Sequence, residues 1–101
     1  MSFGLDNNII QQINNILASH KQIEQAIIYG SRAMGTYRNG SDIDLTLKGD
    51  NINLSTLNKI NNEIDDLLTP YIFDISVFNN IKNKNLIEHI TQVGKIFYQK
   101  Q

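Results

Sequence analysis

The chain lacks cysteine and long apolar runs. It has 101 residues and no cysteine, so neither a disulfide nor a structural zinc bound by cysteine holds the fold, and folding depends on a hydrophobic core. No basic segment precedes an apolar stretch near the first residue, and the uninterrupted apolar runs are only a few residues long. We therefore expect no signal peptide and no membrane span. The absence of cysteine fits a reducing compartment, and we expect a cytoplasmic protein.

The chain also lacks an excess of basic charge. Nine Lys and Arg residues stand against ten Asp and Glu residues, which gives a net charge of -1. Domains that hold nucleic acid by neutralising many phosphates are basic, so we expect no strong direct binding of nucleic acid. A small charged ligand or a protein partner remains open. The length and the 41% of hydrophobic residues predict one domain over residues 1–101.

Apolar periodicity divides the chain into alternating helices and strands. The spacing of isoleucine and leucine predicts helices over residues 7–19, 54–69 and 85–93. Short apolar and β-branched runs predict strands over residues 25–29, 42–48 and 71–78, with a short extended tail over 95–98. One helical turn fits between Gly30 and Gly35. The order predicts an α/β (α+β) fold with one small mixed sheet flanked by helices, whose strand order the pattern does not give.

Three aspartates are candidates for a metal site. Asp42 and Asp44 are separated by one residue on a predicted strand, so both carboxylates lie on one face while Ile43 and Leu45 lie on the other. Asp74 interrupts the apolar strand over 71–78, where a lone carboxylate is costly to bury. If that strand lies beside the first, three carboxylates converge and favour Mg²⁺ or Mn²⁺. The alternative is that these aspartates are solvent-facing charges of an exposed strand edge.

A turn suited to phosphate follows the first predicted strand. Gly30 allows close approach of a ligand to the backbone, and Ser31 offers a hydroxyl beside the N–H groups that open the next helical turn. Arg32, in the same segment, carries a charge that phosphate requires. Alternatively, Ser31 caps the short helix and Arg32 is a solvated loop residue.

These residues carry a family resemblance. Gly30-Ser31, ten further residues and then Asp42-Ile43-Asp44 resemble the Gly-Ser-x10-Asp-x-Asp signature of the DNA polymerase β-like nucleotidyltransferases. The chain is similar over its whole length to the minimal nucleotidyltransferases, the MntA-like antitoxins that accompany HEPN-domain toxins. Met34 departs from the basic residue that many relatives have at this position.

The resemblance implies a minimal nucleotidyltransferase fold and a site with assigned roles. By resemblance, Asp42, Asp44 and Asp74 are the catalytic metal ligands for two Mg²⁺ ions, with Mn²⁺ as a substitute. The nucleotide-binding residues that it implies are Gly30, Ser31, Arg32 and Ser41.

The same resemblance implies an activity and a partner. It implies transfer of AMP from ATP, or of another nucleotide from its triphosphate, to a tyrosine hydroxyl of a HEPN-domain toxin. The chain would then act as an antitoxin within a hetero-oligomer. One alternative is an antitoxin without catalysis that neutralises the toxin by binding. Another is a nucleotidyltransferase that modifies a small molecule.

Overall fold

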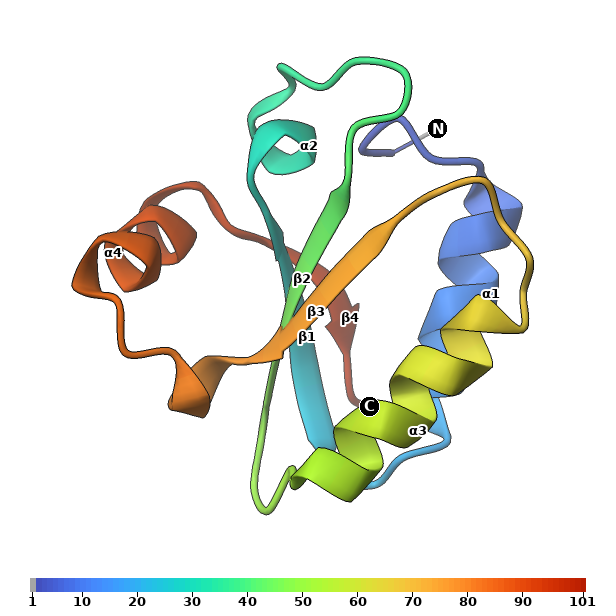
Figure 1. Ribbon diagram of the computed structural model, residues 1–101, viewed down its shortest axis with the longest axis vertical. Helices are drawn as coiled ribbons and strands as arrows, with labels where there is room; N and C mark the ends of the chain where they lie inside the picture. Colours follow the sequence, from blue (N-terminus) through green and yellow to red (C-terminus); the bar gives the residue numbers. More distant parts are fainter. Residues whose placement is uncertain (1) are drawn as a thin grey trace.

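Helices cover both faces of a mixed four-stranded sheet in the computed structural model, which describes residues 2–101 (Figure 1). In chain order the elements are α1 (Asn7–Ala18), β1 (Ile23–Tyr29), α2 (Ser31–Met34), β2 (Ile43–Gly49), α3 (Leu54–Asp65), β3 (Phe73–Val77), the 3₁₀ turn η1 (Phe78–Asn80), α4 (Lys84–Val93) and β4 (Lys95–Gln99). The predicted fold class is confirmed.

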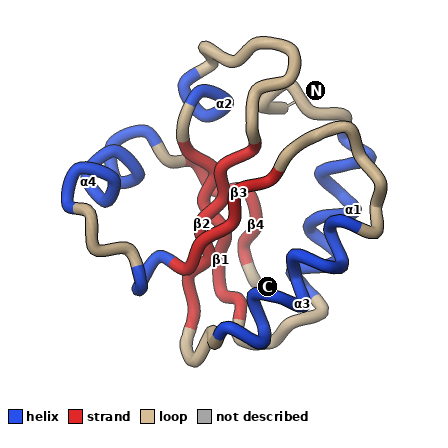
Figure 2. The backbone as a smooth tube through the Cα atoms, in the orientation of Figure 1, coloured by secondary structure: helices blue, strands red, loops and turns tan. Residues whose placement is uncertain are grey.

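The strand order is β3-β2-β1-β4. β1 pairs antiparallel with both β2 and β4, whereas β3 pairs parallel with β2. A parallel pair needs a crossover connection, and α3 supplies it between β2 and β3 (Figure 2). As a result, the ends of β1, β2 and β3 that face α2 lie side by side, which positions the loops before β2 and β3 together with the turn after β1.

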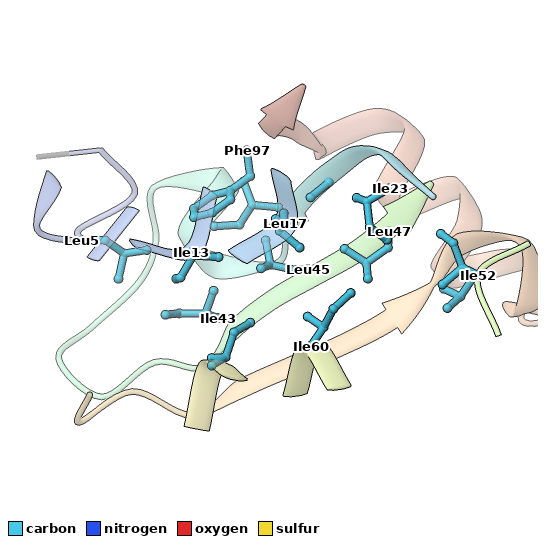
Figure 3. Close-up of a cluster of buried hydrophobic side chains, with 14 of the residues drawn as sticks. Leu5, Ile13, Leu17, Ile23, Ile43, Leu45, Leu47, Ile52, Ile60 and Phe97 are labelled. Carbon is cyan, nitrogen blue, oxygen red and sulfur yellow. The ribbon is translucent and has the colours of Figure 1, made fainter. Parts of the chain in front are cut away.

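The main core fills one face of the sheet beneath α1 and α3 (Figure 3). Ile43, Leu45 and Leu47 point from β2 into this core with no exposed surface. Alternation along the strand directs the intervening residues to the opposite face. The helices contribute buried residues at helical spacing, namely Ile13, Leu17, Ile60 and Ile64.

A smaller cluster lies on the opposite face under α4. Ile90 of α4 packs against Ile27 and Tyr29 of β1, and Leu86 and Val93 border this contact. This helix covers only part of the face, and polar side chains of β2 and β3 occupy the rest of it.

Element ends differ from the predicted ones where turns override periodicity. The helix predicted to continue to residue 69 ends at Asp65, because Leu67 and Leu68 donate to carbonyls three residues back and Leu68 turns to a φ of +53°. The helix predicted to begin at residue 85 begins at Lys84, because the Asn83 side chain accepts the N–H groups of Asn85 and Leu86. The remaining shifts are smaller: α1 ends at Ala18, and the three strands predicted over 25–29, 42–48 and 71–78 occupy Ile23–Tyr29, Ile43–Gly49 and Phe73–Val77.

Leu45→Ala tests the main core. Leu45 has no exposed surface, so its truncation leaves a cavity and should lower the free energy of unfolding by about 2–5 kcal/mol. Urea denaturation followed by circular dichroism measures the loss. Leu54→Ala is the control, because Leu54 is 70% exposed and its truncation should change the stability by less than about 0.5 kcal/mol. Equal losses in the two variants would contradict the assignment of the core.

Candidate active site

Asp44 and Asp74 lie directly opposite each other in the sheet. They are register partners in the parallel pairing of β2 and β3, whose strands are about 4.8 Å apart. Both side chains project from the face of the sheet that is opposite to the one bearing Ile43 and Leu45, as the alternation along the strands predicts. Asp42 lies in the loop one residue before β2 rather than within the strand, and it is exposed like Asp74, whereas Asp44 is half-buried.

The charges of Asp42 and Asp74 both act on the Asp44 carboxyl. The pKa of Asp44 is raised above its ordinary value, first by burial and then by the negative charges of Asp74 and Asp42. The pKa of the neighbouring Tyr29 phenol is also raised, mainly by burial. A hydrogen bond with Ser76 lowers this pKa, whereas the negative charges of Asp44 and Asp74 raise it further. A cation bound at Asp44 would therefore offset both the cost of burying its charged form and the repulsion from the other two carboxylates.

Gly30 closes the site on the side of β1. Its φ of +74° and ψ of -155° lie in a region reserved for glycine. A Cβ at this position would also lie 2.5 Å from Oδ2 of Asp44. Ser31 follows as the first residue of α2, and Gly30 is the cap residue of that helix. The capping role considered for Ser31 is therefore wrong, and a phosphate contact by Ser31 stays a prediction.

Arg32 holds the loop that precedes β2. It is 3% exposed, and its guanidinium donates to the carbonyl oxygens of Ser41 (2.9 and 3.1 Å) and Phe3 (2.9 Å). It also lies over the rings of Tyr37 and Tyr71, with 5.3 and 5.1 Å between the guanidinium carbon and the ring centroids. Ser41 Oγ in turn accepts from the Arg38 N–H. Arg32 and Ser41 thus stabilise the loop that leads to Asp42, and their predicted contact with the nucleotide stays a prediction.

A cavity of about 260 Å³ lies beside this loop and does not coincide with the carboxylates. Its lining residues are Gly4, Arg32, Tyr37, Arg38, Asn39, Gly40, Pro70 and Tyr71. None of the three aspartates is among them. The carboxylates instead lie on an open part of the sheet face beside α4.

His89 joins the site, although its position in the sequence gave no reason to expect this. Its Nε2 accepts a hydrogen bond from the Gly30 N–H over 3.2 Å when the imidazole is neutral. The protonated imidazole, which cannot accept this bond, lowers the pKa of the Asp44 carboxyl. Its ring meets that of Tyr29 edge to face, with centroids 6.2 Å apart. In the sequence, His89 could have been found only from its position on the last helix, next to the apolar Ile90 that is buried against the sheet.

The sequence matches a known family over almost its full length. The model described as "Polymerase beta, Nucleotidyltransferase" matches residues 11–101. The chain belongs to this nucleotidyltransferase family. No curated protein matches the sequence significantly. Membership supports nucleotidyltransferase activity for this chain.

Three solved structures of similar fold come from toxin–antitoxin complexes. A toxin–antitoxin structure with AMP-PNP has a TM-score of 0.71 at 17% identity, and the match covers 96% of this chain and 76% of that one. A MntA–HpeT mutant gives a TM-score of 0.68 at 14% identity, covering 96% and 75%. The tri-AMPylated Shewanella oneidensis HEPN toxin in complex with MNT antitoxin gives 0.69 at 13%, again covering 96% and 75%. At these identities the likeness establishes the fold of this nucleotidyltransferase.

The donor set of the three aspartates suits a hard divalent cation. Their carboxylate oxygens are the ligands that Mg²⁺ and Mn²⁺ prefer, and the pKa of Asp44 is raised first by burial and then by the neighbouring negative charges. Within residues 2–101, however, no three Asp, Glu or His side chains are already arranged to hold a metal ion. The triphosphate of a nucleotide would have to supply further oxygen ligands. Separately, none of the helices in the described part of the chain has the length and apolar content needed to cross a membrane.

Asp44→Asn tests the repulsion in the metal-free protein. Folding raises the pKa of Asp44, so its deprotonation as pH rises removes stability that the neutral amide keeps. With EDTA at pH 7 the variant should melt at the same temperature as the wild type or up to roughly 4 °C higher. The difference should vanish near pH 3, where the carboxyl group is protonated in both states.

Asp50→Asn, an exposed aspartate beyond the other end of β2, is the control for Asp44→Asn and should show no pH-dependent difference. A melting temperature clearly below that of the wild type at pH 7 would instead mark the Asp44 carboxylate as a stabilising group.

Gly30→Ala tests the close approach of Gly30 to Asp44. Alanine there combines a strained backbone with a Cβ 2.5 Å from the carboxylate, and we expect a loss of about 2–4 kcal/mol. Gly35→Ala is the matched control, because Gly35 has a φ of +80° with no atom within 4 Å of an added Cβ and should lose only about 1–2 kcal/mol. Chemical denaturation compares the two, and an equal loss would exclude a contribution from Asp44.

Proposed function

We propose that the chain is an Mg²⁺-dependent adenylyltransferase that transfers AMP from ATP to a tyrosine hydroxyl of a HEPN-domain toxin in the cytoplasm. It would thereby act as the antitoxin of a hetero-oligomeric pair. The observation that carries this proposal is the in-register pairing of Asp44 with Asp74 beside the Gly30 turn. The family supports the class of reaction, and the similar folds in toxin–antitoxin complexes support the kind of partner.

The three aspartates would hold the metal and the turn would hold the phosphates. Asp42 and Asp44 are proposed to bind the metal that accompanies the triphosphate, and Asp74 the metal beside the acceptor. Bound Mg²⁺ would neutralise phosphate charge and lower the pKa of the attacking hydroxyl. Gly30 brings the backbone close to the triphosphate because it has no side chain, and Ser31 offers its hydroxyl at the same turn. Arg32 and Ser41 would act by fixing the loop that carries Asp42.

The reaction would transfer a nucleotidyl group without a covalent enzyme intermediate. The tyrosine oxygen attacks the α-phosphorus of ATP, one P–O bond forms, and the bond between the α-phosphorus and the bridging oxygen breaks to release pyrophosphate. Asp74 is exposed at the open edge of the sheet, so its carboxylate is placed to accept the proton of an incoming hydroxyl. The sheet and helices of residues 2–101 present this edge openly, which suits an acceptor brought by another protein.

A second candidate function is an antitoxin that neutralises its partner by binding alone. The finding that favours it is the lack, within residues 2–101, of three acidic or histidine side chains already arranged around a metal position. In that case the aspartates would be dispensable for protection.

The double variant Asp42→Asn, Asp44→Asn discriminates between the two candidates. The amides keep the shape of the side chains but remove two charged metal ligands, so transfer should fall by at least about a thousandfold. The chain is incubated with a HEPN-domain toxin, ATP and Mg²⁺, and the intact mass of the toxin is measured. The wild type should add whole AMP units, and the double variant none. Growth during toxin expression should show protection by the wild type only.

The control is Asp65→Asn, Asp66→Asn, which makes the same chemical change at the exposed end of α3. This variant should modify the partner and protect cells as the wild type does. Full protection by the Asp42→Asn, Asp44→Asn variant, with an unmodified partner in every sample, would reject the enzymatic function and leave binding as the mechanism.

A further inference from the structure

A histidine from the far end of the chain contacts the turn between β1 and α2. Nε2 of His89 accepts the Gly30 N–H over 3.2 Å, across a separation of 59 residues. The imidazole also packs edge to face against Tyr29, with an interplanar angle of 81°. Helix α4 therefore contacts two consecutive residues of the turn through one side chain.

The hydrogen bond acts on the residue that has the fewest other restraints. Gly30 has a backbone conformation that other residues avoid and no side chain to pack. It contacts the imidazole through its N–H, and an added Cβ would lie 2.5 Å from Oδ2 of Asp44. A bond to its N–H fixes the orientation of the Tyr29–Gly30 peptide, which leads into the Gly30-Ser31 turn. Only an unprotonated ring nitrogen can accept it, so the bond requires the neutral imidazole.

The packing of α4 does not itself require this nitrogen. The helix is anchored by Ile90, which is 3% exposed and packs with Ile27 and Tyr29. An apolar side chain at position 89 would retain contact with the Tyr29 ring. The polar contact to the Gly30 backbone is thus separable from the stability of the helix.

We propose that His89 is a positioning residue for nucleoside triphosphate: by accepting the Gly30 N–H it holds the Gly30-Ser31 turn against Asp44 in the conformation that receives the phosphates. This inference rests on the proposed function, because it concerns the same nucleotide site. Its effect is exerted through the turn, and His89 itself need not touch the nucleotide.

Three substitutions separate the hydrogen bond from packing. His89→Leu fills similar space without an acceptor. His89→Gln places an amide oxygen at about the reach of Nε2, and His89→Asn has the same group one methylene shorter. The affinity for ATP with Mg²⁺ should fall about three- to tenfold in His89→Leu and His89→Asn, the range that one neutral hydrogen bond supports, and recover to within about twofold in His89→Gln. In the transfer assay, KM should rise while kcat changes less.

Two further measurements complete the test. The Gly30 amide resonance in ¹H–¹⁵N spectra of the nucleotide-free protein should move in His89→Leu and stay near its wild-type position in His89→Gln. His20→Gln is the control, since His20, the other histidine, pairs with Glu63 between α1 and α3 and should leave both ATP affinity and the Gly30 resonance unchanged.

The outcomes distinguish this inference from the function on which it rests. If the wild type binds ATP with Mg²⁺ but His89→Leu and His89→Asn bind it equally well or better, the positioning role of His89 is wrong and the proposed function stands. An unmoved Gly30 resonance in His89→Leu would overturn the hydrogen bond itself. If the wild type neither binds ATP nor modifies the partner, the proposed function fails and the inference falls with it.

Discussion

The parallel pairing of β3 with β2 is the constraint on which the rest of the structure depends. It makes Asp44 and Asp74 register partners, and by the same register it places Leu45 beside Ile75 and Leu47 beside Val77 on the other face. Because side chains alternate along a strand, a slip of one residue would bury carboxylates under α1 and α3 and expose the aliphatic residues. The hydrophobic core therefore enforces the geometry of the site.

The site departs from stable packing, and the surrounding structure maintains it. Gly30 has a backbone conformation that only glycine adopts without strain, and Asp44 is half-buried, with a pKa raised first by burial and then by two like charges. Around these residues the contacts are fully satisfied: Arg32 binds two backbone carbonyls and lies over two tyrosine rings, and Asn83 caps the helix that carries His89. Locally unfavourable features such as these do not stabilise the fold. When they occur within an otherwise well-packed structure, they are typical of a functional site.

Sequence patterns predicted the elements and the three aspartates, because both follow from short-range periodicity. Asp74 is a single carboxylate in an otherwise apolar strand. With the assumption that β3 lies next to β2, this was enough to predict that Asp74 lies beside Asp44. The strand order itself depends on long-range packing, which periodicity does not encode. The end of α3 was missed because Leu67 continues the apolar pattern while the chain leaves the helix in tight turns. The burial of Arg32 was missed because its partners are backbone carbonyls, which any sequence supplies.

His89 shows why proximity in sequence is a poor guide to membership of the site. Antiparallel pairing of β4 with β1 brings the C-terminal segment back across the sheet, and α4, which precedes β4, therefore lies over the end of β1. The side chain that meets Gly30 is then set by the helical phase of α4, with Ile90 buried and its neighbour turned toward the turn. A cation bound at Asp44 and the His89 acceptor at the Gly30 N–H would both act on this one glycine. Any change in α4 that rotates the helix would consequently alter the turn even though it removes none of the three carboxylates.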